Sequence, residues 1–135
     1  MEALTTNTVG DRNTAVGYRA LKTMDPSSNA DTMNVGVGYA ALEATTTGIN
    51  NTAVGGYVMQ QNTTGSNNCA FGEQALVGNT TGIQNVAVGR SALASNTTSN
   101  GSVAIGYNAL YANTYDNNMA IGLSLIHISE PTRPY

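Results

Sequence analysis

The chain is poor in the residues that usually carry chemistry. In 135 residues it has one cysteine, one histidine and no tryptophan, and only 10% of the residues are charged. One cysteine cannot form an internal disulfide, so stability must come from packing and hydrogen bonds. Residues 1–122 contain no Ser/His/Asp arrangement, no metal-ligand cluster and no phosphate-binding glycine loop before a lysine. We therefore expect no enzyme activity, and no catalytic, cofactor-binding or metal site.

Two further absences limit the partners. The chain carries 5 Lys and Arg against 8 Asp and Glu, a net charge of −3, and no basic cluster that would neutralise phosphates. No apolar run approaches the roughly 20 residues that a membrane-spanning helix needs. We therefore predict no nucleic-acid partner and no membrane insertion in this segment.

What the chain has instead is a short phrase repeated seven times. It reads Asn-Thr-Ala-Val-Gly at 51–55 and Ser-Val-Ala-Ile-Gly at 102–106, and its glycines recur at steps of 21, 17, 17, 17, 17 and 16 residues. The seven register glycines are Gly17, Gly38, Gly55, Gly72, Gly89, Gly106 and Gly122. A unit this short cannot bury its apolar face alone, so neighbouring units must stack into a solenoid.

Each repeat continues in the same order. Ala-Leu follows the glycine in five copies, and a polar turn such as Asn-Thr-Thr-Gly at 62–65 comes next. The stretch from Leu4 to Gly10 matches the second half of a copy, so the sequence starts in mid-repeat. The longer first step comes from extra residues between Thr23 and Asp31, which predict a loop bulging from one rung.

The repeat predicts an all-β, parallel β-solenoid of about seven 17-residue rungs over residues 1–122. Each rung would hold two short extended pieces: a strand closed by a bend at the glycine, and a second apolar edge that begins at Ala-Leu. Rungs about 4.8 Å apart would make a rod of roughly 34 Å. Two ladders are predicted to form the core: Leu21 through Leu110, and Val16, Val37, Val54, Phe71, Val88, Ile105 and Ile121.

A second description of the rung remains open. Gly-Glu-Gln-Ala-Leu at 72–76 and Gly-Arg-Ser-Ala-Leu at 89–93 contain good helix formers, which would suit one strand plus a single helical or 3₁₀ turn. A helix of four or five residues is marginal by itself, so we favour the all-β rung. In both descriptions the strands are parallel.

The core of such a rung is small. One Val or Ile and one Leu would be buried for 17 ordered residues, which is little apolar area for the conformational entropy lost. A second buried surface contributed by other chains would compensate. The thin core therefore predicts a homo-oligomer.

The phrase Ser-Val-Ala-Ile-Gly-Tyr-Asn-Ala at 102–109 resembles the YadA-like head repeats of trimeric autotransporter adhesins. The longer spacing with Asn-Thr-Thr-Gly, as in 51–65 and 68–82, is similar to repeats of phage tail-fibre proteins that end in an endosialidase-type chaperone. The resemblance implies a left-handed parallel β-roll, a homotrimer, and attachment to a host-surface glycan or protein. The location would be a virion tail fibre or a bacterial cell surface. The 17-residue period is longer than that of the adhesins.

Rows of threonines support an alternative function. Adjacent threonines recur at 46–47, 63–64, 80–81 and 97–98, and a regular hydroxyl array would suit a monomeric ice-binding β-solenoid. Because these pairs lie beside glycines, turn chemistry is the simpler explanation. The Asn-Thr-Thr triplets at 62, 79 and 96 also match the glycosylation sequon, although their composition alone accounts for the match.

Three other groups of residues were weighed as sites. Tyr18, Tyr39 and Tyr107 follow the register glycine and Tyr57 lies one place later, so they form either an outer contact row or packing against the next rung or protomer. Cys69 occupies a slot held elsewhere by Thr or Val and is interpreted as an inert filler. The acidic residues match no calcium-loop spacing: Asp11, Asp25, Asp31, Glu43, Glu73 and Asp116.

The last 13 residues do not continue the repeat. Residues 123–135 read Leu-Ser-Leu-Ile-His-Ile-Ser-Glu-Pro-Thr-Arg-Pro-Tyr and resemble a translated sequencing adapter. We interpret this segment as a non-native, disordered tail and leave it out of the functional argument.

Overall fold

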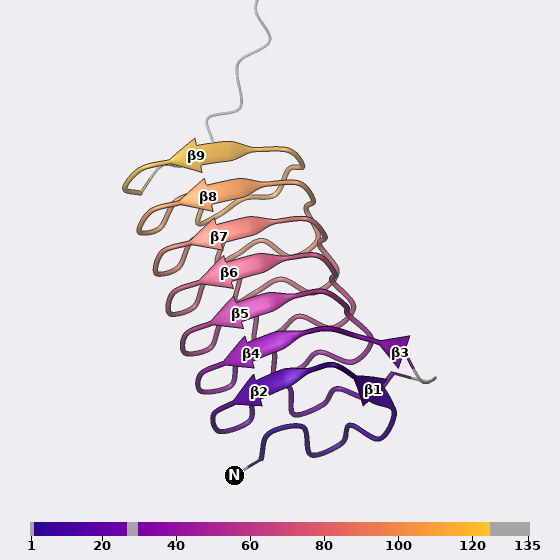
Figure 1. Ribbon diagram of the computed structural model, residues 1–135. Helices are drawn as coiled ribbons and strands as arrows, with labels where there is room; N and C mark the ends of the chain where they lie inside the picture. Colours follow the sequence, from indigo (N-terminus) through magenta and orange to yellow (C-terminus); the bar gives the residue numbers. More distant parts are fainter. Residues whose placement is uncertain (1, 27–29, 125–135) are drawn as a thin grey trace, which may run out of the picture.

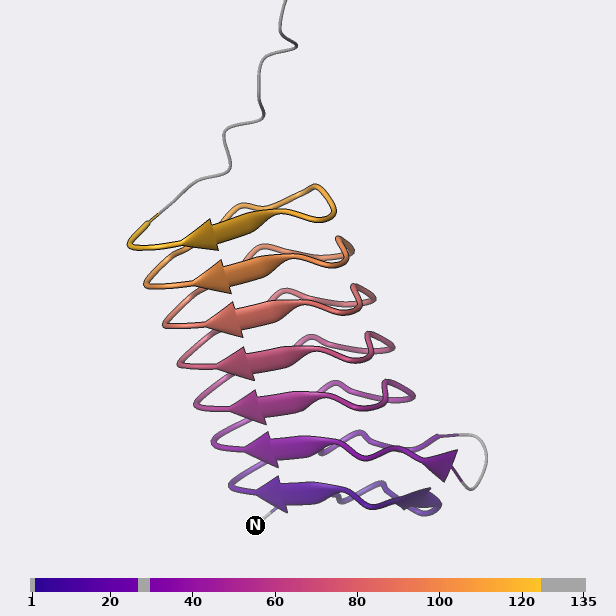
Figure 2. The ribbon, with the colours of Figure 1, turned by 45° about the horizontal axis from the view of Figure 1, so that its top comes forward.

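The computed structural model describes residues 2–26 and 30–124, which form a regular coil of stacked rungs (Figures 1 and 2). Within these ranges there is no helix, and the strands are short: β1 (Gly10–Asp11), β2 (Thr14–Val16), β3 (Ala30–Asp31), β4 (Val35–Val37), β5 (Thr52–Val54), β6 (Cys69–Phe71), β7 (Val86–Val88), β8 (Val103–Ile105) and β9 (Met119–Ile121). Seven of them form one parallel sheet in the order β2-β4-β5-β6-β7-β8-β9. The fold is an all-β parallel solenoid of about 6 turns.

Equivalent residues of successive repeats stack on one another. Thr52 pairs with Cys69, Ala53 with Ala70 and Val54 with Phe71, and the other strands keep the same register. The 21-residue first step keeps it too, since Thr14 pairs with Val35. In this longer step β3 forms a separate two-stranded ladder with β1, in which Gly10 pairs with Ala30 and Asp11 with Asp31. The repeat predicted from the glycines is therefore confirmed.

The second half of each rung is neither a strand nor a helix. It is a row of turns in which alternate residues have left-handed backbones, as at Gln74 (φ 60°) and Leu76 (φ 51°). Backbone hydrogen bonds join these turns to the neighbouring rungs: Leu76 N–H donates to Ala92 O at 2.9 Å, and Gln74 N–H donates to Gly56 O at 2.9 Å. The helical-turn alternative is therefore wrong for the described residues, and so is the prediction of a second extended piece, because the alternating left-handed residues turn the backbone.

The Leu ladder lies in the core, as predicted. One large side chain per rung is fully or almost fully buried: Leu21, Leu42, Met59, Leu76, Leu93 and Leu110. On the opposite wall the middle residue of each strand is Ala or Gly. A Cβ placed on Gly36 would lie 3.4 Å from Leu21 Cγ, so this wall directly contacts the Leu column. The interior is therefore one large side chain and one alanine wide.

The second predicted core ladder is wrong. Val16, Phe71 and Ile121 are 57%, 40% and 64% exposed, and the remaining members are exposed or half-buried. The first and third residues of each strand point outward because side chains alternate along a strand and the middle alanine points inward. A coil this narrow has no room for Val or Ile opposite Leu, so alanine occupies the inner position.

Both ends of the described chain continue the hydrogen-bond pattern. Leu4 N–H donates to Ala20 O at 3.1 Å, which places residues 2–12 as the second half of a rung. At the other end Ser124 N–H donates to Tyr107 O at 2.7 Å, so the ladder reaches two residues beyond Gly122. The rest of the predicted tail, residues 125–135, lies outside the described residues.

Candidate interaction surface

The outer face of the seven-stranded sheet is covered by apolar side chains. Two columns, together called the sheet face, run along the solenoid. One column, formed by the third residue of each strand, contains Val16, Val37, Val54, Phe71, Val88, Ile105 and Ile121. The other contains Thr14, Val35, Thr52, Cys69, Val86, Val103 and Met119. In the middle rungs Phe71, Val88 and Ile105 remain 36–40% exposed, which is unusual for a continuous row of large apolar residues.

Aromatic and charged residues border one edge of the sheet face. The residues that follow the register glycines, here called the post-glycine column, are Tyr18, Tyr39, Gly56, Glu73, Arg90, Tyr107 and Leu123. The Tyr18 and Tyr39 rings stack with centroids 5.4 Å apart, and Tyr39 and Tyr57 lie 5.1 Å apart. The three residues remain partly exposed, at 38–46%. The predicted tyrosine row therefore packs along the rungs and also faces outward.

The same column is polar farther along. Arg90 Nε lies 3.2 Å from the Glu73 carboxylate, and the Arg90 guanidinium lies 5.9 Å from the Tyr107 ring centroid. Both charged side chains are more than half exposed. An exposed pair of this kind contributes little to stability, so these side chains can be reoriented at low cost.

Left-handed residues border the other edge. The residue two places before each strand, here the pre-strand column, has a φ between 48° and 66° in every rung: Arg12, Met33, Asn50, Asn67, Gln84, Gly101 and Asn117. The Asn50, Asn67, Gln84 and Asn117 side chains are exposed. Within the described residues no hydrogen bond involves their side-chain amide groups, although their backbone N–H groups are bonded. They form a row of free donors and acceptors beside the apolar sheet face.

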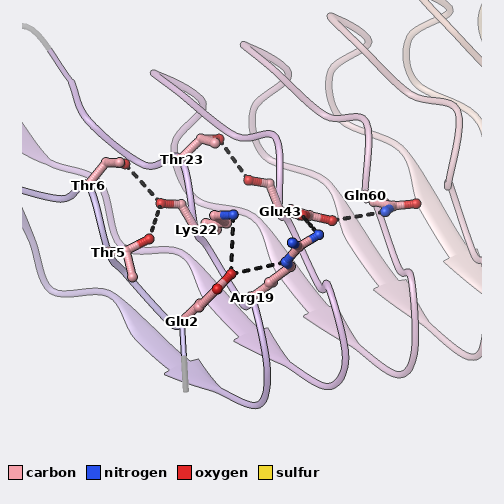
Figure 3. A network of polar contacts seen from close by, with 8 residues as sticks. All are labelled: Glu2, Thr5, Thr6, Arg19, Lys22, Thr23, Glu43 and Gln60. Atoms are coloured by element: carbon pink, nitrogen blue, oxygen red, sulfur yellow. Dashed lines mark hydrogen bonds and ion pairs between the residues drawn. The ribbon is translucent and has the colours of Figure 1, made fainter.

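Ion pairs brace the first rungs (Figure 3). Glu2 accepts from Arg19 Nε at 3.0 Å and lies 3.2 Å from Lys22 Nζ. Arg19 also reaches Glu43 at 3.3 Å, and Glu43 accepts from Gln60 Nε2 at 2.9 Å. Lys22 and Arg19 lower the pKa of the Glu2 carboxyl. The network joins four successive rungs and is structural, because every charged member is already paired.

Two ladders of buried asparagines run inside the coil. In one, Asn68 N–H donates to Asn51 Oδ1 at 3.0 Å and Asn68 Nδ2 donates to Gly82 O at 2.8 Å. In the other, Asn79 Nδ2 donates to Asn62 Oδ1 at 2.8 Å and Asn96 Nδ2 donates to Asn79 Oδ1 at 3.1 Å. The three sequon asparagines (Asn62, Asn79 and Asn96) are fully buried members of this second ladder. Their amides are therefore inaccessible to modification in the folded protein.

The threonine rows are divided between two roles. Thr63 Oγ1 donates to Thr80 O at 3.0 Å, and Thr80 Oγ1 donates to Thr97 O at 3.0 Å. These hydroxyls continue the ladder, as a turn role requires. The second threonine of each pair is exposed at the corner: Thr47, Thr64, Thr81 and Thr98.

Cys69 lies half-buried on the sheet face, between Thr52 and Val86. Burial raises the pKa of its thiol, which makes the thiolate rarer than in water. The side chain therefore fills a place in an apolar column, and its reactivity reports whether that face is covered.

The acidic residues considered for metal binding are dispersed. Asp31 pairs with Arg12 at 2.8 Å, Asp25 accepts from Thr8 at 2.8 Å, and Asp116 accepts from the backbone N–H of Asn100 at 2.7 Å. Among residues 2–26 and 30–124 no three His, Cys, Asp or Glu side chains come together, and no pocket is present. In the same part of the chain no helix is long and apolar enough to cross a bilayer.

Sequence reasoning missed the sheet face because it placed one of the two columns inside. A signal was available: the middle strand position is Ala or Gly in all seven repeats, whereas the third position ranges from Val to Phe. A position whose side chain is never larger than that of Ala indicates a confined interior. The third position, whose side chain varies in size, indicates the outer surface.

Comparisons of the chain with protein-family models, with curated proteins and with solved structures found no match.

Proposed function

We propose that this chain is a structural and adhesive repeat segment of a homotrimeric fibrous surface protein, such as a phage tail fibre or a bacterial adhesin head. The observation that carries the proposal is the sheet face, a row of Val, Phe and Ile side chains that runs through seven strands and is exposed in five of them and half-buried in two. An exposed apolar row of this length marks an association surface. The occupant we commit to is the same face of other copies.

A continuous sheet face suits identical partners. In each copy the outward-facing residues of successive strands are stacked at the same rung spacing. Copies whose solenoid axes are parallel therefore bring equivalent rungs to the same height. Large apolar side chains then fill the space between the sheets. This contact supplies the second buried surface that the thin core of a single coil lacks.

The low charge fits an attachment role for the remaining surface. Between residues 44 and 124 the only charged residues are Glu73, Arg90 and Asp116. Binding by such a surface would depend on shape, hydrogen bonds and aromatic contacts rather than on long-range electrostatic attraction. A host glycan or protein is the partner class we propose, at a virion tail fibre or a bacterial cell surface.

The proposal is tested by the solution mass of the chain, measured by light scattering behind a sizing column. We expect about three times the 13.9 kDa chain mass. In the same sample the Cys69 thiol should react with a maleimide far more slowly than in the urea-unfolded chain. A monomer mass with a rapidly reacting thiol would contradict trimerisation. Binding of the labelled trimer to a glycan array tests the adhesive part.

The alternative, a monomeric ice-binding β-solenoid, is supported by the exposed row of Thr47, Thr64, Thr81 and Thr98. The row is a single column wide, because the neighbouring threonine hydroxyls donate to backbone carbonyls. Thermal hysteresis of the monomer would support this function, and its absence in concentrated solution would reject it.

A further inference from the structure

The two borders of the sheet face are placed to meet each other in a trimer, an inference that rests on the proposed function. The strands run across the solenoid axis, and the rungs stack along that axis (Figures 1 and 2). When three sheets surround a common axis parallel to the solenoids, each strand runs tangentially. The end of each strand then points toward the start of the equivalent strand in the neighbouring copy. The contact is heterologous and closes after three copies.

The sheet face alone is too narrow for a stable contact. A three-residue strand spans about 10 Å, and six rung spacings span about 29 Å, so the flat face covers on the order of 300 Å². A standard interface buries about 800 Å² on each partner. Face-to-face packing of two copies therefore falls short, whereas a closed ring adds both borders of every sheet to the buried area.

The chemistry of the two borders is complementary. The post-glycine column presents tyrosine edges, the Glu73 carboxylate and the Arg90 guanidinium, and these side chains are exposed. The pre-strand column presents the amides of Asn50, Asn67 and Gln84, which make no hydrogen bond within the described residues. An amide both donates and accepts, so it can pair with a phenol, a carboxylate or a guanidinium.

We infer that the post-glycine column of one copy packs against the pre-strand column of the next copy. This seam surrounds the apolar contact of the sheet faces with aromatic and polar residues, as interface rims are usually built. The seam also fixes the register between copies, because Glu73 and Arg90 can bond to the side-chain amides of the pre-strand column only when particular rungs lie side by side.

Cysteine cross-linking tests the seam. In a Cys69→Ser background, Asn67→Cys and Glu73→Cys are combined, since these residues flank β6 on its two sides. Pairs with Asn50→Cys or Gln84→Cys in place of Asn67→Cys cover an offset of one rung. Under mild oxidation we expect at least one pair to yield a covalent trimer on a non-reducing gel. Each single cysteine variant should yield no covalent trimer.

The matched control is Thr64→Cys with Glu73→Cys, in which the first cysteine lies on an exposed turn outside the seam. A trimer by light scattering in which none of the three pairs cross-links would overturn the seam and leave the proposed function standing. Covalent dimers from a single cysteine variant would also overturn it, in favour of a two-fold contact. A monomer by light scattering would overturn the seam and the trimer together.

Discussion

The backbone N–H of Asn68 donates to the side-chain oxygen of Asn51, one rung earlier, at 3.0 Å. Asn68 in turn accepts from the backbone N–H of Asn85 at 3.0 Å and donates to Gly82 O at 2.8 Å. Each buried asparagine therefore satisfies backbone groups that strand pairing leaves free. Leaving a buried group unpaired costs about 1–3 kcal/mol.

Asn68→Ala is accordingly expected to destabilise the chain by about 1–3 kcal/mol, because the buried Asn85 N–H loses its partner, whereas the Gly82 carbonyl keeps the bond from Asn79 Nδ2 at 3.1 Å. The measurement is the free energy of unfolding from urea titration. The control is Thr81→Ala, an exposed residue whose side chain makes no hydrogen bond within the described residues. Equal midpoints for the two variants would show that the asparagine ladder contributes nothing.

Two glycines provide a second matched pair. Gly72 has a φ of +122°, and a Cβ there would lie 2.7 Å from the Gly89 carbonyl carbon. Gly56 has nothing within 4 Å of such a Cβ. We expect Gly72→Ala to cost more than about 2 kcal/mol, because both the backbone conformation and the contact are unfavourable.

Gly56→Ala should leave the melting temperature unchanged or raise it slightly, by at most about 1 kcal/mol in stability. Thermal unfolding followed by circular dichroism distinguishes the two variants. A Gly72→Ala protein that melts with the wild type would mean that the rungs separate more easily than their spacing suggests.

Placing a charge on the sheet face should affect assembly more than folding. Val88 is 36% exposed, so Val88→Asp keeps the carboxylate in contact with water in a single coil, but the trimer contact would bury it unpaired. We expect a folded monomer at concentrations where the wild type is a trimer. Light scattering and far-ultraviolet circular dichroism of the same peak measure both properties.

Thr81→Asp is the control for that variant because it adds the same charge on an exposed turn. It should remain a trimer. An unfolded Val88→Asp chain would show that a single coil does not fold without its partners, and a trimeric one would show that copies associate elsewhere.

Acid should weaken the first rungs through Glu2. Lys22 and Arg19 hold the folded-state pKa of Glu2 below its unfolded value, so their contribution is present above the unfolded pKa and is lost as pH falls through the folded pKa. Glu2→Gln should therefore lower the melting temperature slightly at pH 7. The difference from wild type should shrink as the pH falls through the folded-state pKa of Glu2. Adding 1 M salt at pH 7 should reduce it as well, because exposed pairs are screened.

Much of the fold could be predicted because the sequence repeats itself. The register glycines set the pairing of all seven strands, and Ala-Leu placed Leu76 and its equivalents in the core. The prediction failed on which side chains of each strand point into the core. The alternation of side chains along a strand is compatible with either Val54 or Ala53 pointing inward. The narrow interior of the coil has room only for the alanine.

The borders of the candidate surface were harder to predict. The tyrosines after the register glycine were noticed, but the pre-strand column carries different residues in most rungs, from Met33 to Gln84. These positions share a backbone conformation, φ of 48° to 66°, rather than a side-chain type. A shared left-handed backbone leaves little trace in the sequence, since only Asn and Gly favour it intrinsically.

The corner between Asp25 and Asp31 tolerates extra length without disturbing its neighbours. The first step has 21 residues and the next has 17, yet Thr14 and Val35 still pair, and so do Val35 and Thr52. The four added residues of the first step are therefore accommodated without a shift in the pairing of the strands on either side. The corner thus offers a grafting position, at which a foreign peptide can be displayed on the side of a rod whose geometry is set by all the other rungs.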